Sequence, residues 1–267
     1  GVPAPYLAER YEVSEDGLQY TFYMKENIFF HDGVPITAED VVYTVQAAKN
    51  PEIKSPRRAN WEGVDVIAVD QRTVVFTLRA PYGLFIENTT MGILPKHVWS
   101  PLAAEEFPFS EQNTNPVGSG MYEITSIKKN ASGIPTEYTL TASGNGADRP
   151  FIKHLVFTFY SNAEALQSAL ENGDIMAAHS VVGEESASTV IEEAIFARVF
   201  GVFFNQNQQE LFADATVRNA LNRAIDKNQI VATVLSGYGS VLNGPLPPDN
   251  VQREGIESES ADARVQE

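Results

Sequence analysis

The chain has 267 residues, with 35 acidic against 19 basic side chains and a formal net charge of −16 at pH 7. This balance argues against nucleic acid or an anionic membrane surface as a partner, because both attract a basic footprint. Cysteine is absent, which excludes disulfide bonds, thiolate metal ligands and a catalytic thiol. No stretch reaches the roughly 20 apolar residues that span a bilayer. The length suits one large domain or two small ones.

The first clear elements are a strand, a turn and a helix. Apolar and polar residues alternate over 18–25, which predicts a half-buried strand. Asp32-Gly33 predicts a turn after it. Thr37 precedes an acidic, apolar-periodic segment, so we expect its hydroxyl to accept an amide hydrogen bond at the start of a helix.

Two more strands are expected before the first junction in the chain. The alternating segments Val64–Val69 and Thr73–Leu78 flank Asp70-Gln71 and predict a hairpin. The basic segment Asn50–Arg58 has the composition of an exposed connecting loop. The polar, turn-forming run Glu111–Pro116 then indicates a domain junction, so we expect residues 1–114 to form one compact α/β unit.

The middle of the chain predicts an open mixed sheet with a helix on its face. We expect strands at Met121–Ile127, Glu137–Leu140, His154–Phe159 and Asp174–Ala178. Between the last two, a helix is predicted over 163–172, with Asn162 as its N-cap and Gly173 as its end. Residues 115–180 are therefore expected to form a second unit.

The remaining residues, 181–267, predict a third unit that ends in a frayed acidic tail. Its expected elements are a helix over 184–194, a strand over 196–204, a helix over 215–225 capped by Asp214, and a helix over 228–235. Arg218 lies off the apolar stripe of the third of these elements, so we expect it to be structural and to pair with Asp214 or another carboxylate.

Several segments, in a fixed order, carry the pattern of a known family. They are Leu7–Leu18, Phe30–Gly33, Ile36–Val41, Ile93–His97, Asn115–Tyr122, Phe204–Asn205, Phe212–Asp226 and Gly244–Pro248. In these the chain resembles the family 5 extracellular solute-binding proteins, receptors of bacterial ABC importers for oligopeptides, dipeptides, nickel complexes and some glycosides. Met121 departs from the pattern, because the family more often has Pro there. Family members are also much longer than 267 residues, so we expect this chain to be a fragment.

The resemblance implies a fold and a division of the chain. The implied fold is an α/β, or mixed α+β, periplasmic-binding-protein-like type II (class C) multi-lobe fold that is incomplete here. Residues 1–114 would be the small extra domain typical of the family. Residues 115–180 would be part of the first binding lobe, and 181–267 the beginning of the second.

The sequence contains none of the common motifs of catalysis or metal binding. Phosphate-binding loops and the Gly-x-Ser-x-Gly nucleophile elbow are absent. The four histidines, at positions 31, 97, 154 and 179, lack the spacing of metal ligands. His31 stands beside Asp32, and mutual capping in a turn is the interpretation we favour over a catalytic dyad. We therefore predict no catalytic residue, no metal site and no cofactor.

Four residues are candidate ligand contacts. Tyr82 and Trp99, like Trp61 and Phe85, are large rings that either line a cleft or pack in a core. Asn205, preceded by Phe204, is expected at the end of a strand. There its amide either faces an interdomain cleft and binds peptide groups, or caps the loop 206–210. The resemblance implies that most other ligand contacts belong to the C-terminal half of family members.

The function that the resemblance implies is capture of a peptide or similar small solute, without chemical change, in a cleft between lobes. The implied partners are the solute and the ABC permease subunits, and the implied location is the periplasm or the outer face of the cytoplasmic membrane, through a secreted or lipid-anchored parent. Two alternatives stay open. One is a hydrolase that uses a carboxylate pair on a polymer, and the other is an interaction module without a ligand.

Overall fold

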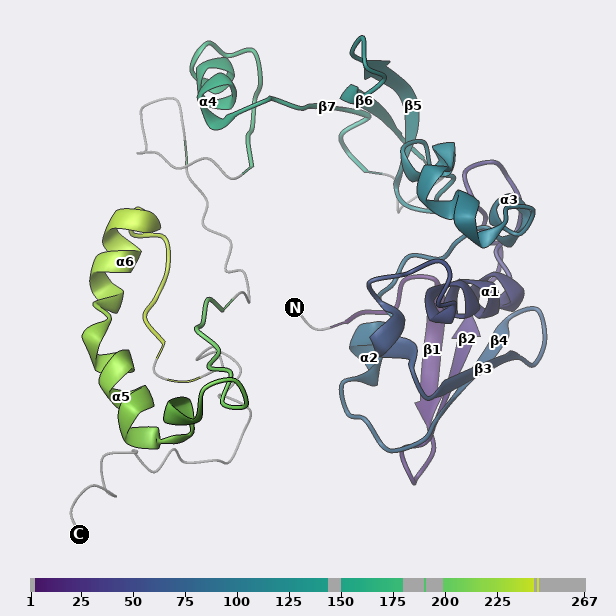
Figure 1. The fold of residues 1–267 in the computed structure, drawn as a ribbon. Helices are drawn as coiled ribbons and strands as arrows, with labels where there is room; N and C mark the ends of the chain where they lie inside the picture. Colours follow the sequence, from purple (N-terminus) through teal and green to yellow (C-terminus); the bar gives the residue numbers. More distant parts are fainter. Residues whose placement is uncertain (1–2, 144–149, 180–189, 191–198, 243, 245–267) are drawn as a thin grey trace. The chain divides into compact units, whose positions relative to one another are not determined.

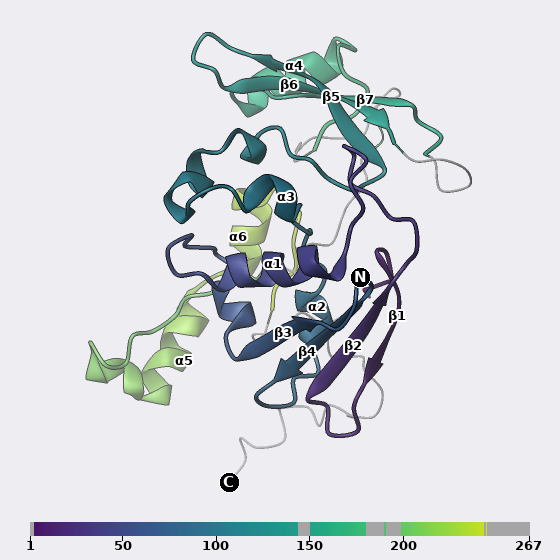
Figure 2. The same cartoon turned by 90° about the vertical axis from the view of Figure 1, so that its right-hand side faces the viewer.

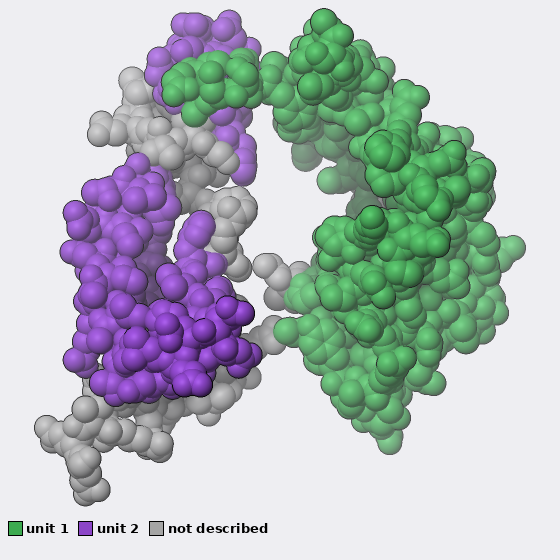
Figure 3. Space-filling view, viewed as in Figure 1, with its two compact units in different colours: residues 1–165 green, residues 166–267 purple. Residues whose placement is uncertain are grey.

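The computed structural model describes residues 3–143, 150–179, 190, 199–242 and 244. The chain divides into two compact units, residues 1–165 and residues 166–267, which Figure 3 colours separately. The expected boundaries at 114 and 180 stay predictions. None of the helices in the described ranges is long and apolar enough to cross a membrane.

The first unit begins with a four-stranded antiparallel sheet (Figures 1 and 2). Its strands are β1 (Ala8–Val13), β2 (Gln19–Met24), β3 (Val64–Ala68) and β4 (Thr73–Leu78), in the order β1-β2-β4-β3. The predicted hairpin is confirmed, because Val64 pairs with Leu78 across β3 and β4. Asp70 closes the turn between them by accepting hydrogen bonds from the amides of Arg72 and Thr73, at 2.7 and 2.8 Å.

Helix α1 (Ala38–Lys49) lies across one face of this sheet, as Figure 2 shows, and contacts β3 and β4. Aromatic rings form the core beneath it. Phe85, at the start of α2 (Phe85–Asn88), lies with its ring centroid 5.5 Å from that of Phe76 and 4.7 Å from that of Tyr20. Trp61, in the 3₁₀ turn Arg58–Trp61, packs on the same two phenylalanines. The predicted first α/β unit therefore has a core of buried aromatic rings.

Short helical segments follow this core. They are α3 (Lys96–Trp99) and the 3₁₀ turns Ala104–Phe109 and Glu111–Asn113. Trp99 and Phe107 are both buried, with ring centroids 5.0 Å apart, and they pack against Ala47 of α1. This second cluster attaches the segment to the side of the helix.

A three-stranded antiparallel sheet completes the strands of the first unit. It contains β5 (Tyr122–Lys129), β6 (Pro135–Ala142) and β7 (His154–Thr158) in sequence order. The three strands that we predicted are confirmed, but among the described residues they form an antiparallel sheet and not the mixed sheet that we expected. The fourth, expected at 174–178, is wrong: this segment is irregular and Met176 in it is fully exposed. An apolar run alone does not make a strand, because a strand needs a partner to satisfy its backbone.

Three described helices follow. Helix α4 (Ala163–Glu171) begins where the Asn162 side chain accepts from the Ala165 amide at 2.8 Å, and Gly173 follows it with φ +76°. Helix α5 (Ala215–Ala224) is capped by Asp214, which accepts from the Thr216 amide at 2.8 Å. Helix α6 (Lys227–Val234) is likewise confirmed. A 3₁₀ turn, Glu210–Ala213, precedes α5.

Two predictions for this part had other outcomes. The helix predicted over 184–194 lies outside the described residues, apart from residue 190. Of the strand predicted over 196–204, the described residues 199–204 have no strand conformation, and Phe203 is almost fully exposed. That prediction is wrong for those residues for the same reason as above: no strand in the part of the chain that the structure describes pairs with them.

Candidate functional site

The turn at 30–34 of the first unit is held by several hydrogen bonds. The amide of Phe30 donates to the carbonyl of Val34 at 2.9 Å, and the amide of Gly33 donates back to Phe30 at 2.9 Å. Gly33 has φ +83°, a left-handed conformation that glycine adopts at little cost. The ring of Phe30 is buried in the first core. The turn is therefore a rigid platform for its two titratable residues.

His31 bonds across to the segment that leads into β5. Its amide donates to the carbonyl oxygen of Gly118 at 2.8 Å, and its Nε2 lies 2.9 Å from the carbonyl oxygen of Gly120. A carbonyl oxygen only accepts, so Nε2 carries a hydrogen in this contact. The sequence pattern gave no indication of this contact.

Asp32 pairs with a histidine that is distant in sequence. Its Oδ2 lies 2.7 Å from Nε2 of His97 on α3, and its Oδ1 accepts from the Val34 amide at 3.1 Å. Burial acts to raise the pKa of Asp32, but the hydrogen bonds from His97 and Val34 outweigh it and hold that pKa below its usual value. The predicted mutual capping of His31 and Asp32 is wrong, because each side chain turns to a different partner.

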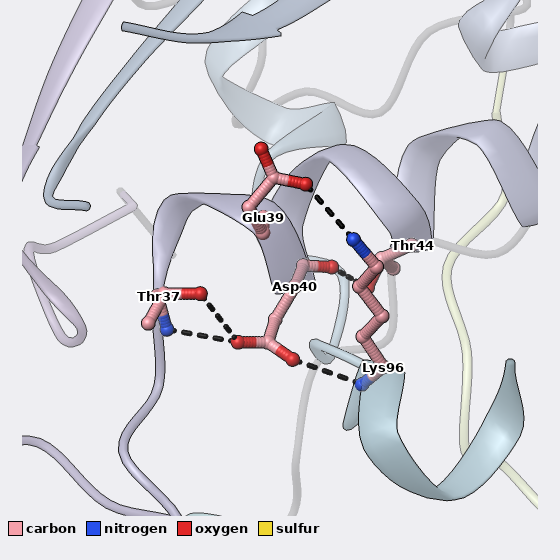
Figure 4. Close-up of polar contacts among 5 residues, drawn as sticks. All are labelled: Thr37, Glu39, Asp40, Thr44 and Lys96. Atoms are coloured by element: carbon pink, nitrogen blue, oxygen red, sulfur yellow. Dashed lines mark hydrogen bonds and ion pairs between the residues drawn. The ribbon is translucent and has the colours of Figure 1, made fainter. Parts of the chain in front are cut away.

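Asp40 is the central residue of the start of α1 (Figure 4). Its buried carboxylate accepts from the Thr37 amide at 2.8 Å, the Thr37 hydroxyl at 3.0 Å and the Lys96 amide at 2.9 Å. Thr37 is the N-cap, as predicted, and its hydroxyl also donates to Asp40 within the capping box that the two residues form. A helix N-terminus favours such a carboxylate.

Two further contacts join α1 to Leu94 and to Lys96, the first residue of α3. The hydroxyl of Thr44 donates to the Asp40 carbonyl at 2.7 Å and accepts from the Leu94 amide at 2.9 Å. Lys96 Nζ lies 3.0 Å from a carboxylate oxygen of Glu39 at the surface. Two of the segments that carry the resemblance, 36–41 and 93–97, thus meet through a network of hydrogen bonds.

The second sheet has an apolar face with a hollow of about 300 Å³. The residues that line it are Asn113, Thr114, Pro116, Ile124, Tyr138, Leu140, Phe157 and Phe159. Tyr138 donates its hydroxyl hydrogen to the carbonyl of Thr114 at 2.8 Å, which fixes one wall. The alternation of apolar residues in β6 and β7 was a signal that could have located this hollow from the sequence. No acidic residue lies among the described residues of the lining, so the hollow supplies no carboxylate pair.

The structure separates the two aromatic candidates of the first unit. Tyr82 is about half exposed in the loop between β4 and α2, where its carbonyl accepts from the Tyr20 hydroxyl at 3.3 Å. Trp99 is buried and packs on Phe107. Trp61 and Phe85 are buried in the first core as well. A role for Tyr82 or Trp99 in ligand contact stays a prediction.

Phe204 and Asn205 lie together in the second unit. The ring centroid of Phe204 is 5.1 Å from that of Phe212. The Asn205 side-chain oxygen accepts from the Gln208 amide at 3.2 Å, and its carbonyl accepts from the Gln209 amide at 3.2 Å. This is the capping geometry that we considered as one of two alternatives. A ligand contact of either residue stays a prediction.

Arg218 donates to main-chain carbonyls. Its Nη1 lies 2.6 Å from the carbonyl oxygen of Phe212 and 2.8 Å from that of Ala213. The expected carboxylate partner, Asp214, instead caps α5. Among the described residues, no group of three or more His, Asp or Glu side chains is placed to hold a metal ion.

Comparison with known protein families shows which family this chain belongs to. The sequence matches the family described as "Bacterial extracellular solute-binding proteins, family 5 Middle" over residues 2–264. The chain belongs to this family. The resemblance read from the sequence is thereby confirmed, and the mixed α/β fold agrees with it.

Individual curated proteins are similar to this chain along most of its length. It is 31% identical to Protein XP55 of Streptomyces lividans over 255 residues, 92% of this chain and 45% of XP55. It is 27% identical to the oligopeptide-binding protein AppA of Bacillus subtilis over 254 residues, 91% of this chain and 45% of AppA. The chain spans about half the length of these curated relatives.

Two solved structures share the fold. NikZ from Campylobacter jejuni, in complex with Ni(L-His), aligns with a TM-score of 0.68 and 28% identity over 91% of this chain and 49% of NikZ. AppA from B. subtilis, in complex with a nonapeptide, aligns with a TM-score of 0.66 and 26% identity over 91% of this chain and 49% of AppA.

Proposed function

We propose that this chain is part of the substrate-binding component of an ABC importer, which captures a peptide or similar small solute without changing it chemically. The family match over residues 2–264 is the observation that carries this proposal. The relatives add chemical detail, since AppA was solved with a nonapeptide and NikZ with a nickel–histidine complex. The proposed location is outside the cytoplasmic membrane, and the proposed partner is an ABC permease.

The rigidity of the first unit suits part of a solute-binding protein. Capture without chemistry needs rigid lobes that present polar groups, because the ligand selects the closed state through differential contacts. The closed core around Phe85 and the hydrogen-bonded network of Asp40 provide that rigidity. Asn205, Phe204, Tyr82 and Trp99 are proposed as ligand contacts.

Calorimetry tests the proposal. The full product of the gene that encodes this chain is titrated with a library of dipeptides, tripeptides and longer peptides, and with Ni(L-His). We expect one of these to bind with a Kd on the order of 1 μM or tighter, and mass spectrometry to recover it unaltered. Absence of binding by every probe, or cleavage of a bound peptide, would contradict the proposal.

A parallel titration uses the 267-residue chain alone. We expect it to bind the same ligand with a Kd on the order of 1 mM or weaker, because a cleft walled on one side leaves much of the ligand in water. Tight binding by the chain alone would show that these residues contain a complete site. An Asn205→Ala variant of the gene product tests the proposed contact and is expected to weaken binding. Asn130→Ala is the matched control, because the Asn130 side-chain oxygen likewise accepts main-chain amides in a turn, and we expect it to leave binding unchanged.

The hydrolase alternative is tested in the same samples. It requires a pair of carboxylates, one of them with a raised pKa. The carboxylates with shifted pKa among the described residues are Asp16, Asp32 and Asp70, and all three pKa values are lowered. Polymer hydrolysis above a buffer control would favour this alternative over capture.

A further inference from the structure

Three consecutive carbonyls in the segment before β5 are held by the first part of the unit. The oxygens of Gly118 and Gly120 contact the amide and the Nε2 of His31, at 2.8 and 2.9 Å. The oxygen of Ser119 between them accepts from the hydroxyl of Tyr6 at 3.5 Å. Strand β5 begins two residues later, at Tyr122. This segment is the covalent link from the four-stranded sheet to the three-stranded sheet.

The backbone of Gly118 and the ring of His31 lie close together. A Cβ atom added at Gly118 would lie 3.4 Å from Cε1 and 3.6 Å from Nδ1 of the His31 ring, which is van der Waals contact, so the imidazole lies directly beside this residue. Gly118 also follows Val117, which packs against the first core. The ring of His31 therefore lies against the backbone of a residue that is itself next to the first core.

We propose that His31 is a positioning residue, whose imidazole fixes the direction in which the chain leaves the first sheet and enters the second. Its main-chain bond to Gly118 sets the position of the segment. Its side-chain bond to Gly120, two residues further on, sets the orientation. Two points of attachment on one rigid turn define a direction, where one point would leave rotation free. This role goes beyond solute capture and does not depend on it.

The turn that carries His31 is also held in place by hydrogen bonds of its other titratable residue, Asp32. Asp32 bonds His97 of α3, and the neighbouring Lys96 amide bonds Asp40 of α1. The imidazole is thus connected, through short hydrogen bonds, to the helix that covers the first sheet. Movement of the 118–120 segment would have to break the Gly120 contact or deform this turn.

Distance measurement by pulsed electron–electron double resonance tests the proposal on the whole 267-residue chain. The chain has no cysteine, so spin labels at Thr77→Cys and Ser132→Cys are the only labels present. Thr77 is exposed on β4, and Ser132 is exposed in the turn between β5 and β6. The labels therefore report the relative position of the two sheets, and no ligand is added.

Three variants are compared in this labelled background. His31→Phe keeps a ring and the main-chain bond but removes the Nε2 donor, and we expect at least a doubling of the width of the distance distribution. His31→Gln keeps an N–H donor on a side chain of similar reach, and we expect it to restore most of the original width. His154→Phe is the matched control, because His154 contacts Thr141 and not the 118–120 segment; we expect no change.

The outcomes are distinct. An unchanged distribution in His31→Phe would overturn the proposal, and so would an equal broadening in His31→Phe and His31→Gln. If His31→Phe fails to fold, as judged by near-ultraviolet circular dichroism, His31→Ala decides. It keeps the main-chain bond to Gly118 and removes the side-chain contact with Gly120, so the distribution is expected to broaden, and an unchanged one overturns the proposal. Ligand binding enters none of these readouts, so failure here leaves the proposed function standing.

Discussion

The two sheets of the first unit differ in what covers them. The four-stranded sheet is covered by α1 and α2 and buries Trp61, Phe76 and Phe85 almost completely. The three-stranded sheet leaves its apolar face open, so that Phe157 and Phe159 are about half exposed. Both sheets are antiparallel and both alternate apolar with polar residues. The stability of each therefore depends on the layer that packs against it more than on its strands.

The contrast extends to polar groups. In α1, which covers the four-stranded sheet, the buried carboxylate of Asp40 accepts hydrogen bonds from three donors. In the second sheet, the side-chain bonds are mostly exposed, such as the contact between Thr125 and Thr141. Hydrogen bonds that are shielded from water are costly to lose, whereas exposed ones exchange readily with solvent. We therefore expect substitutions to cost much in the first part and little in the second.

The largest expected effect is that of Phe85→Ala. Phe85 is fully buried, so its truncation removes apolar burial and leaves a cavity, and we expect a loss of about 3–5 kcal/mol in the free energy of unfolding. Urea denaturation followed by tryptophan fluorescence measures it, because both tryptophans, Trp61 and Trp99, are buried in this part.

Phe157→Ala is the matched substitution in the second sheet. Because this ring is 51% exposed, we expect a loss below about 1 kcal/mol, measured by circular dichroism. Equal losses in the two variants would break the comparison, since they would mean that the open face is as well packed as the closed one.

The next effect concerns the start of α1. Asp40→Asn replaces a buried carboxylate that has three donors by an amide, and we expect a loss of about 2–3 kcal/mol. Glu39→Gln, one residue earlier, removes only an exposed ion pair with Lys96 and should cost less than about 1 kcal/mol. Thermal unfolding of the two variants provides the measurement, and a larger loss in Glu39→Gln would contradict the assignment.

Much of the fold could be predicted where local pattern and tertiary partner agree. Strand β2 and helix α1 were predictable because alternation, a turn and an acidic first turn all occur within 18–49. Strand β1 was missed, since almost every residue in it is exposed and an edge strand needs no apolar face. The strand expected at 174–178 failed for the opposite reason, because it has apolar residues but no partner.

The site was less predictable than the fold. Asp214 and Asn162 act as caps as expected, because a cap depends on residues within one helical turn. The partners of His31, Asp32 and Arg218 could not be predicted, because each bonds atoms that are placed by the tertiary fold. Two of these three side chains bond main-chain carbonyls, which every residue carries and no sequence pattern marks.

A smaller effect should separate two hydroxyls of the second sheet. The hydroxyl of Tyr138 bonds the Thr114 carbonyl at a partly buried position, so Tyr138→Phe should cost about 1 kcal/mol. Tyr122 makes a similar bond to Ile152 in an exposed position, and Tyr122→Phe should cost less than about 0.5 kcal/mol. Hydrogen exchange of the β5–β7 amides, read by mass spectrometry, checks both. Equal protection in the two variants would mean that burial does not distinguish these bonds.

The smallest effect depends on pH and tests the turn at 30–34. The pKa of Asp32 is lowered in the folded chain, so its ionised form contributes stability above the unfolded pKa of about 4. That contribution is lost as the pH falls through the lower, folded pKa. We therefore expect Asp32→Asn to be less stable than the unaltered chain by about 0.5–1 kcal/mol at pH 7, and the difference to shrink below pH of about 4.

Urea denaturation at a series of pH values measures this difference directly. Asp65→Asn is the control, because Asp65 is a largely exposed carboxylate 3.8 Å from Lys49. It should show a difference near zero throughout. A constant difference for Asp32→Asn across the pH range would mean that its loss comes from shape and not from charge. The turn would then owe its rigidity to Gly33 and the buried Phe30, and His97 would be dispensable to it.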